Sequence, residues 1–418
     1  MRKQLFFAIP LLLSVFLLTN CNFAPKKESD RPMNLFNQAG ISQDEVDKKI
    51  EDVYQFLFES EEKIYFEVND SMAYVSDLKN LDVRTEGVSY GMMVAVQLDK
   101  KDVFDKIWRW TKEYMQHKDG PRKGYFGWSL DPTTMKLNSM GSASDGELFF
   151  ITTLLFASNK WGDDTGIDYY AEARFILDSM WEKDGTDNIH NIINVDEKKI
   201  TFVPEGYGYY WTDPSYYVPA FFDIWALYAK DGHEDFYKEV ADSARVFLHR
   251  ACHPVTGLTS DYTEYSGEPK STQWMPEGFH YDSWRVPLNI AMDYTWFGKD
   301  KEWQENYAKR IQTFFRSEGV DSFNDQYNLD GTTPEIIFGA GADRITKLRH
   351  SIGLKSTLAT TALVLNENDE SLDFVKALWN AKLEPYEDGY FDPYYDGLLY
   401  LFSLMMLNDQ YKHIEPVL

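Results

Sequence analysis

The 418-residue sequence predicts an all-α fold in which six inner helices are surrounded by six outer ones, an (α/α)6 barrel. Helical periodicity dominates the chain from residue 42 onward. Helices that are apolar throughout alternate with helices that carry charge on one side. No compositional break and no long Ser/Pro-rich linker follows residue 40, so residues 41–418 are predicted to form one domain.

Twelve segments have the spacing of apolar residues that is typical of helices. They are 42–59, 88–99, 101–117, 145–158, 168–182, 216–230, 234–251, 284–297, 302–317, 351–365, 370–381 and 394–408. The segments that begin at 88, 145, 216, 284, 351 and 394 are the apolar ones, as expected of buried helices. The alternative is a generic helical solenoid, but no fixed repeat of the TPR or HEAT type is present.

Two stretches are expected to be extended. Residues 63–68 (KIYFEV) read as a short strand, and the alternating stretch HNIINVDEKKITFV predicts a hairpin around 190–203.

Residues 1–20 have the features of an export signal. A positively charged start is followed by the apolar run Leu5–Leu18, which is shorter than the ~20 residues that a membrane span needs. The run ends in Leu-Thr-Asn-Cys, similar to a bacterial lipobox, which predicts an exported lipoprotein anchored through Cys21 at the periplasmic or cell-surface side. Residues 21–40 are then the lipidated cysteine and a tether. The alternative is an ordinary secretory signal with an incidental cysteine.

The sequence contains two cysteines and 8 histidines. If Cys21 carries lipid, Cys252 has no intrachain partner, so burial rather than disulfides must hold the fold. The histidines show no H-E-x-x-H or comparable spacing, so a zinc enzyme is not expected.

The balance of 42 Lys+Arg against 67 Asp+Glu leaves a net charge of −25. Such acidity argues against nucleic acid as a partner and against binding to an anionic lipid surface, so the predicted lipid is the only membrane contact expected. Aromatic residues make up 16% of the chain, which suits a neutral, polyhydroxylated ligand that stacks on rings.

The loops before the inner helices carry carboxylates. In a barrel these loops meet at one end, so their side chains are expected to converge. Asp145, Asp213, Asp282 and Asp396 each also suit a helix N-cap, and singly the capping role is the more common one. Glu86 is a poor cap and lies in a Thr-Glu-Gly turn, so a catalytic role and simple surface placement are equally open for it before the other loops are considered.

Together these carboxylates fit a glycosidase. Cleavage of an acetal needs a protonated acid at the leaving oxygen and a carboxylate that activates water or attacks the anomeric carbon. Glu86 suits the acid if burial or a neighbouring carboxylate raises its pKa. A helix N-terminus lowers the pKa of a carboxyl group, which suits Asp282 as the base.

Several ordered motifs resemble glycoside hydrolase family 8, mainly over residues 80–300. They are TEGVSYGMMVAVQL, GYFGWSLDP, SASDGELFF, DPSYYVPAFFDIW and YDSWRVPLNIAMDYTWFG, with YYDGLLYLFSLM near the C-terminus. The resemblance implies an (α/α)6 barrel, an inverting mechanism on β-1,4-linked glycans and no cofactor.

The resemblance also implies roles for individual residues. Glu86 matches the general acid, Asp282 the general base, and Asp145 the acid that holds the central sugar in a distorted ring. Substrate-binding roles fall to residues near these three, where Tyr216 is expected to hydrogen-bond beside the base. They are Arg84, Trp128, Tyr216, Arg285, His350 and Tyr394.

Within the family, the motifs are most similar to the xylan branch, and especially to an exo-acting enzyme that releases xylose from the reducing end of xylo-oligosaccharides. That enzyme has a His-bearing loop that blocks the cleft beyond the leaving group, and Lys347–Ser351 is the counterpart here, with His350. Ser351 replaces the usual proline after the histidine. An endo-acting xylanase or glucanase of the same family stays an alternative.

Two other classes compete with this interpretation. A non-catalytic glycan-binding lipoprotein needs aromatic residues but no acid and base pair, so Glu86, Asp145 and Asp282 count against it. A toroidal lyase or isomerase that acts on uronic acids calls for a basic cleft, which the net charge of −25 disfavours.

Overall fold

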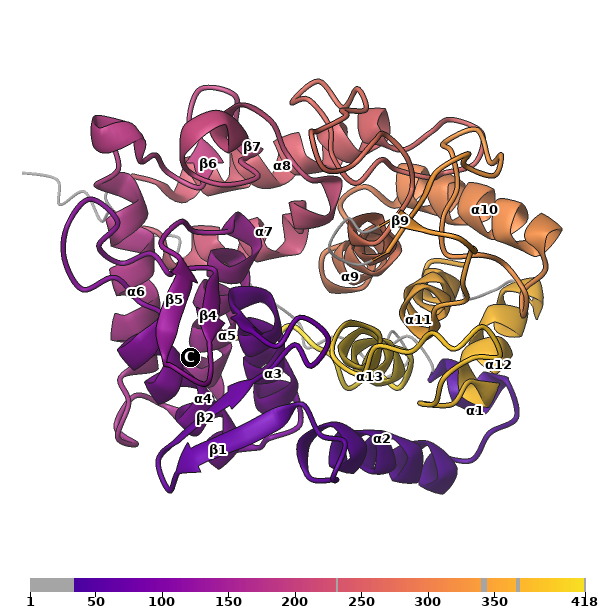
Figure 1. Ribbon diagram of the computed structural model, residues 1–418, viewed down its shortest axis with the longest axis horizontal. Helices are drawn as coiled ribbons and strands as arrows, with labels where there is room; N and C mark the ends of the chain where they lie inside the picture. The colour runs from indigo at the N-terminus through magenta and orange to yellow at the C-terminus, as the bar shows by residue number, and fades with distance from the viewer. Residues whose placement is uncertain (1–33, 231, 340–343, 366–368, 417–418) are drawn as a thin grey trace, which may run out of the picture. The chain divides into compact units, whose positions relative to one another are not determined.

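The computed structural model describes residues 34–230, 232–339, 344–365 and 369–416. The predicted signal peptide and Cys21 lie outside these residues. Within them the chain forms the predicted barrel, in which outer and inner helices alternate from the outer helix α2 (Gln43–Phe58) to the inner helix α13 (Tyr395–Leu407) (Figure 1). The fold class read from the sequence is therefore confirmed.

Six helices form the inner ring. They are α3 (Thr85–Gln97), α5 (Ser144–Trp161), α7 (Pro219–Tyr228), α9 (Val286–Trp296), α11 (Ile352–Thr360) and α13 (Tyr395–Leu407). Each contacts the next in chain order, and α13 contacts α3, which closes the ring. Every residue of α13 is buried, as its apolar sequence LLYLFSLMML predicts.

The outer helices carry a buried stripe and a solvated face. They are α2 (Gln43–Phe58), α4 (Lys101–Tyr114), α6 (Tyr169–Trp181), α8 (Glu234–Ala251), α10 (Lys301–Glu318) and α12 (Leu372–Asn380). In α4, for example, Phe104, Ile107 and Trp108 are buried. The charges of the six outer helices nearly balance, with 18 Asp and Glu against 15 Lys and Arg, so most of the acidic surplus of the chain lies outside these helices.

Proline residues shift two predicted helix starts. The segment expected from 216 begins as α7 at Pro219, after a 3-10 turn over Pro214–Tyr216. The segment expected from 284 begins as α9 at Val286 and has Pro287 in its first turn, after a 3-10 turn over Asp282–Arg285. Proline has no N–H to donate to a preceding carbonyl, and only the first turn of an α-helix tolerates that loss, so an α-helix starts at or next to it.

Short strands border the barrel. β1 (Tyr65–Asn69) pairs antiparallel with β2 (Met72–Val75), close to the strand expected at 63–68. The hairpin expected around 190–203 forms with only two residues in each strand, β6 (Ile193–Asn194) and β7 (Lys199–Ile200).

Other strands were not expected from the sequence. β3 (Val83–Arg84), β4 (Ser129–Asp131) and β5 (Lys136–Ser139) form one sheet, and β8 (Ile337–Phe338) pairs with β9 (Arg344–Ile345). The first sheet places the loop before α3 beside Trp128, whose carbonyl accepts a hydrogen bond from Thr85 N–H at 3.0 Å.

The packed part of the chain begins earlier than residue 41. Helix α1 (Leu35–Gln38) falls in the stretch that the sequence assigned to the tether, yet Leu35 and Phe36 are fully buried. The Phe36 ring lies 5.4 Å from that of Trp379. Residues 34–40 therefore belong to the folded body.

One buried ion network joins α7, α8 and α9. The Arg245 guanidinium donates to Asp223 and Asp293, each at 2.6 Å, and all three side chains are at most 6% exposed. The Gln304 amide also donates to Asp293 at 2.8 Å. The network satisfies charges that cost a great deal to bury unpaired.

Candidate active site

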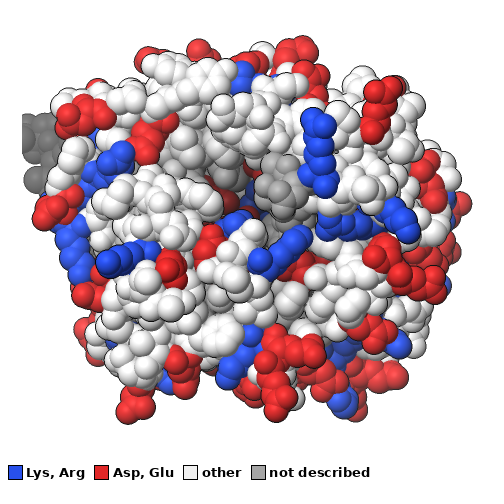
Figure 2. Space-filling model, viewed as in Figure 1, with Lys and Arg blue, Asp and Glu red and all other residues white. Residues whose placement is uncertain are grey.

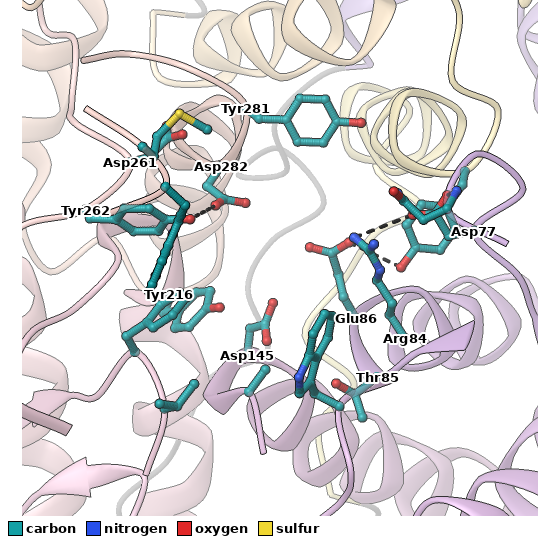
Figure 3. A pocket seen from close by; sticks show the side chains of 18 of the residues that line it. Asp77, Arg84, Thr85, Glu86, Asp145, Tyr216, Asp261, Tyr262, Tyr281 and Asp282 are labelled. Atoms are coloured by element: carbon teal, nitrogen blue, oxygen red, sulfur yellow. Dashed lines mark hydrogen bonds and ion pairs between the residues drawn. The ribbon is translucent and has the colours of Figure 1, made fainter. Parts of the chain in front are cut away.

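A cavity of about 440 Å³ opens at the end of the barrel where α3 and α5 begin. Figure 2 shows this face of the molecule hollowed near its centre. Seven of the nine site residues proposed for the barrel line the cavity, and Figure 3 shows most of them. They are Arg84, Glu86, Trp128, Asp145, Tyr216, Asp282 and Tyr394. The structure thus brings together residues that lie as much as 310 positions apart in the chain.

Arg285 lies behind the cavity wall and is 3% exposed. Its Nη1 lies 2.8 Å from Glu86 Oε2 and 3.3 Å from Asp145 Oδ2. Its Nη2 lies 2.9 Å from Asp282 Oδ1 and 3.5 Å from Asp213 Oδ2. One guanidinium cannot neutralise four carboxylates, two of them buried and two partly buried, so these four groups hold protons more tightly than exposed acids do.

Glu86 occupies the first turn of α3, and its side chain is 18% exposed. Burial raises the pKa of Glu86 to about 7, helped by Asp145 and Asp282 and opposed by Arg285 and Arg84. Desolvation outweighs the helix N-terminus here. Glu86 is therefore protonated for much of the time near neutral pH, as a general acid must be.

Asp282 faces Glu86 across the opening (Figure 3). The Tyr262 hydroxyl donates to its Oδ2 at 3.4 Å. Burial raises the pKa of Asp282, while Arg285 opposes the rise. The expectation that a helix N-terminus lowers this pKa was wrong, because Asp282 begins a four-residue 3-10 turn in a buried site.

Asp145 and Asp213 complete the acidic group. Asp145 is 6% exposed, and its Oδ1 accepts the N–H of Gly146 at 2.9 Å. Asp213 is fully buried, and it caps the turn after it by accepting the N–H of Ser215 at 2.6 Å. Burial raises the pKa of both carboxyl groups. Asp213 thus caps a turn and lies beside Arg285, and its burial favours the protonated form.

Arg84 and Trp128 lie together on the side of the cavity that holds Glu86. The Arg84 guanidinium lies 5.5 Å from the centre of the Trp128 ring. It also pairs with Asp82 at 3.0 Å and with Asp77 at 3.5 Å. These contacts fix the arginine beside the acid and leave the Trp128 ring on the cavity wall, where a sugar face can stack on it.

Two tyrosines flank the carboxyl groups. The Tyr394 hydroxyl donates to Glu86 Oε1 at 3.3 Å. Tyr216 does not make the hydrogen bond expected beside the base: its ring packs 5.6 Å from the Arg285 guanidinium, and Tyr262 contacts Asp282 instead.

Sequence reasoning missed Asp261 and Tyr262. Both line the cavity and come from the long irregular stretch between α8 and α9. Asp261 accepts hydrogen bonds from the N–H groups of His280 and Ser283 at 3.1 Å each, so it holds the turn that carries Asp282. Helical periodicity does not predict which side chains of such an irregular stretch face the cavity. The only signal in the sequence is the adjacent Asp261 and Tyr262 in a loop between two helices.

His350 does not line the cavity. Asp388 Oδ2 lies 2.8 Å from its backbone nitrogen and 2.9 Å from its ring Nδ1. Its ring stacks on that of Tyr386 at 5.5 Å. These contacts hold the imidazole outside the lining of this cavity, and the substrate-binding role of His350 stays a prediction.

The described part of the chain contains no group of three or more His, Cys, Asp or Glu side chains arranged to hold a metal. No helix in that part is long and apolar enough to cross a membrane. Cys252 is buried, and its thiol is free. The chemistry available in the cavity is that of two carboxyl groups facing each other, one of them with a raised pKa near 7.

Comparison with known proteins gives concordant matches. The sequence model of family 8 of the glycosyl hydrolases matches residues 75–406, which include every residue that lines the cavity. A reducing end xylose-releasing exo-oligoxylanase of Halalkalibacterium halodurans is 38% identical over 383 residues, or 91% of this chain and 93% of that protein. The reducing-end xylose-releasing exo-oligoxylanase Rex8A of Paenibacillus barcinonensis is 38% identical over 384 residues, or 91% of this chain and 96% of that protein. A solved structure of a Rex8A mutant complexed with an arabinofuranosyl-xylotetraose has a TM-score of 0.83 at 36% identity and covers 92% of this chain and 97% of its own.

Proposed function

Because the chain belongs to glycoside hydrolase family 8, we propose that its cavity hydrolyses β-1,4-xylosidic bonds with inversion and releases xylose from the reducing end of xylo-oligosaccharides. The observation that carries the proposal is the single guanidinium of Arg285, which joins Glu86 and Asp282 across the opening. The two relatives that cover nine-tenths of the chain are both named as enzymes of this specificity.

The geometry supports a direct displacement. Glu86, protonated near neutral pH, gives its proton to the glycosidic oxygen as the bond from that oxygen to the anomeric carbon breaks. Asp282 takes a proton from a water molecule, whose oxygen bonds to the anomeric carbon from the opposite face. One guanidinium and two hydrogen bonds separate the carboxyl groups, which is compatible with the roughly 6.5–9.5 Å that an inverting pair needs to admit the water.

Arg285 has two functions in this scheme. It holds both carboxyl groups in place through separate nitrogens, and it stabilises the charge on Asp282 before the water is activated. Asp145 also contacts Arg285 and lies on the cavity wall, where it is placed to bind the sugar that undergoes attack. Trp128 supplies an aromatic wall for a sugar face.

The test uses purified residues 22–418 and xylohexaose labelled at its reducing end. The expected first products are labelled xylose and unlabelled xylopentaose. NMR should show that the new anomeric centre, at the reducing end of the xylopentaose, has the inverted configuration. A mixed ladder of products supports endo action instead and overturns the exo assignment. Asp282→Asn and Glu86→Gln are expected to lose almost all activity, and full activity in Asp282→Asn contradicts its role as base.

We also propose, from the sequence, that Cys21 is lipidated and that the exported protein is anchored to a membrane at the periplasmic or cell-surface side. The support is the short apolar run that ends at this cysteine. Cells fed labelled fatty acid are expected to label the full chain but not Cys21→Ser, which should appear in the soluble fraction. Equal labelling of both chains contradicts the proposal.

A further inference from the structure

A second cavity of about 560 Å³ adjoins the first. Gly339 lines both. Tyr281, on the wall of the first cavity, donates its hydroxyl proton to Asp392 Oδ2 at 2.7 Å, and Asp392 lines the second. The hydroxyl of Tyr390, another residue of the second cavity, lies 3.5 Å from that of Tyr281. The two cavities therefore share a wall.

The second cavity lies beyond the proposed acid. Asp77 and Asn80 line the first cavity, while Lys79, between them in the chain, lines the second. Figure 3 shows Asp77 and Arg84 on the same side of the opening as Glu86. The acid protonates the leaving oxygen, so this is the side on which the leaving sugar sits.

Two cations face the second cavity. Lys79 Nζ lies 5.4 Å, and the Arg349 guanidinium 4.7 Å, from the centre of the same Tyr390 ring. Neither forms an ion pair with any carboxylate among the described residues, although the chain as a whole has a net charge of −25. Cations left without carboxylate partners in so acidic a protein are available to a ligand.

The carboxylates of the cavity are already engaged. Asp388 accepts hydrogen bonds from the backbone and ring of His350. Asp392 accepts from Tyr281 and from the N–H groups of Tyr394 and Tyr395. These contacts engage both carboxylates. The charged groups of Lys79 and Arg349, in contrast, lie over the Tyr390 ring and form no ion pair among the described residues, and Asp392 and Asp325 attract them only at longer range.

We propose that the second cavity binds a carboxylate carried by the sugar on the leaving-group side, through Arg349 and Lys79. The planar fork of arginine matches a carboxylate, and lysine adds a second positive charge. The inference rests on the proposed function, because it places the leaving sugar next to this cavity. Two sources supply such a group: the C1 carboxylate of an oxidised reducing end, and a uronosyl branch on the terminal xylose.

The experiment compares three substrates with the purified enzyme at low salt. They are xylotetraose, its aldonic acid with a carboxylate at C1, and xylotetraose with a glucuronosyl branch on the reducing-end xylose. At least one anionic substrate is expected to have a lower KM than xylotetraose. For that substrate, Arg349→Ala and Lys79→Ala are each expected to raise KM roughly fivefold, as loss of a partly exposed ion pair does, with KM for xylotetraose unchanged.

Two variants act as controls. Arg349→Lys keeps the charge and should retain part of the preference. Lys48→Ala removes a cation from the exposed face of the outer helix α2, where Lys48 pairs with Asp52, and should change nothing.

Each result is decisive. An effect with the aldonic acid alone identifies the oxidised end as the source, and an effect with the branched substrate alone identifies the branch. The proposal is overturned if the wild type has no preference for either anion, or if Arg349→Ala impairs all three substrates equally. Failure of the wild type to cleave xylotetraose at all instead counts against the proposed function.

Discussion

Gly87 directly follows Glu86, and its missing side chain leaves room for the Tyr394 ring. A Cβ atom at position 87 would lie 1.9 Å from Tyr394 Cε2 and 2.5 Å from its hydroxyl oxygen. Carbon atoms in contact are about 3.5 Å apart, so Gly87→Ala forces the ring to move by roughly 1.5 Å. Since the Tyr394 hydroxyl lies 3.3 Å from Glu86 Oε1, the movement breaks that contact.

The magnitude follows from two opposing effects. Overpacking costs about 1–3 kcal/mol, while replacing glycine by alanine in a helix returns ~1 kcal/mol. The difference is a loss of about 0–2 kcal/mol, so the free energy of unfolding by urea is expected to fall by about 1 kcal/mol. Activity should fall further, because a displacement of ~1 Å beside a catalytic group can cost as much as 10²-fold in rate. The readout is kcat/KM on xylotetraose.

A double-mutant cycle isolates the cause. In Tyr394→Ala the ring is gone, so adding Gly87→Ala there is expected to be neutral or to stabilise the protein by up to ~1 kcal/mol. If Gly87→Ala costs the same free energy in both backgrounds, the clash with Tyr394 is not the reason, and the argument is refuted.

Three further results are expected. The value of kcat/KM should fall as pH rises through about 7, where Glu86 loses its proton. Asp145→Asn should move this fall to lower pH, because the Asp145 charge helps to raise the pKa of Glu86. A pH profile that does not move contradicts that coupling. Tyr262→Phe removes the one hydroxyl that donates to Asp282 among the described residues, which raises the pKa of that carboxyl group. The acidic limb of the pH profile of kcat/KM should therefore move to higher pH. A shift to lower pH argues against the hydrogen bond. Arg245→Met leaves the buried Asp293 without its cation and leaves Asp223 paired only with the half-exposed Lys299. The change should lower the free energy of unfolding by about 3–5 kcal/mol, whereas a loss below ~1 kcal/mol in urea titration would show that the network carries little stability.

The local spacing of apolar residues was sufficient to predict the barrel fold. The stretch LLYLFSLMML is apolar on every side, and the only place for such a helix is inside, where α13 lies. Alternation with amphipathic helices such as α4 then leaves few arrangements other than two concentric rings. The helix starts at Pro219 and Val286 differ from the prediction, because apolar spacing continues across a turn that proline prevents from being α-helical.

The active-site carboxylates were found partly from sequence. Glu86 stood out because it is a poor helix cap in a glycine turn, and Asp282 because of its motif. The pKa of Asp282 was mispredicted, since the chain order shows a helix start but not the burial that surrounds it. Tyr262 and Asp261 were missed because an irregular loop has no period from which to place its side chains.

The sequence by itself determined the class of fold, the family and the residues that face the barrel end, because helical spacing and short motifs are local properties of the chain. Only the tertiary structure decided what those residues do to one another. Arg285 gathers four carboxyl groups from distant segments, and their shared desolvation sets the pKa of Glu86 to about 7. The same holds for the position of His350, whose ring pairs with Asp388 and lies outside the lining of the main cavity. Proton affinity and side-chain direction depend on through-space neighbours, and these exist only once the ring of helices has closed.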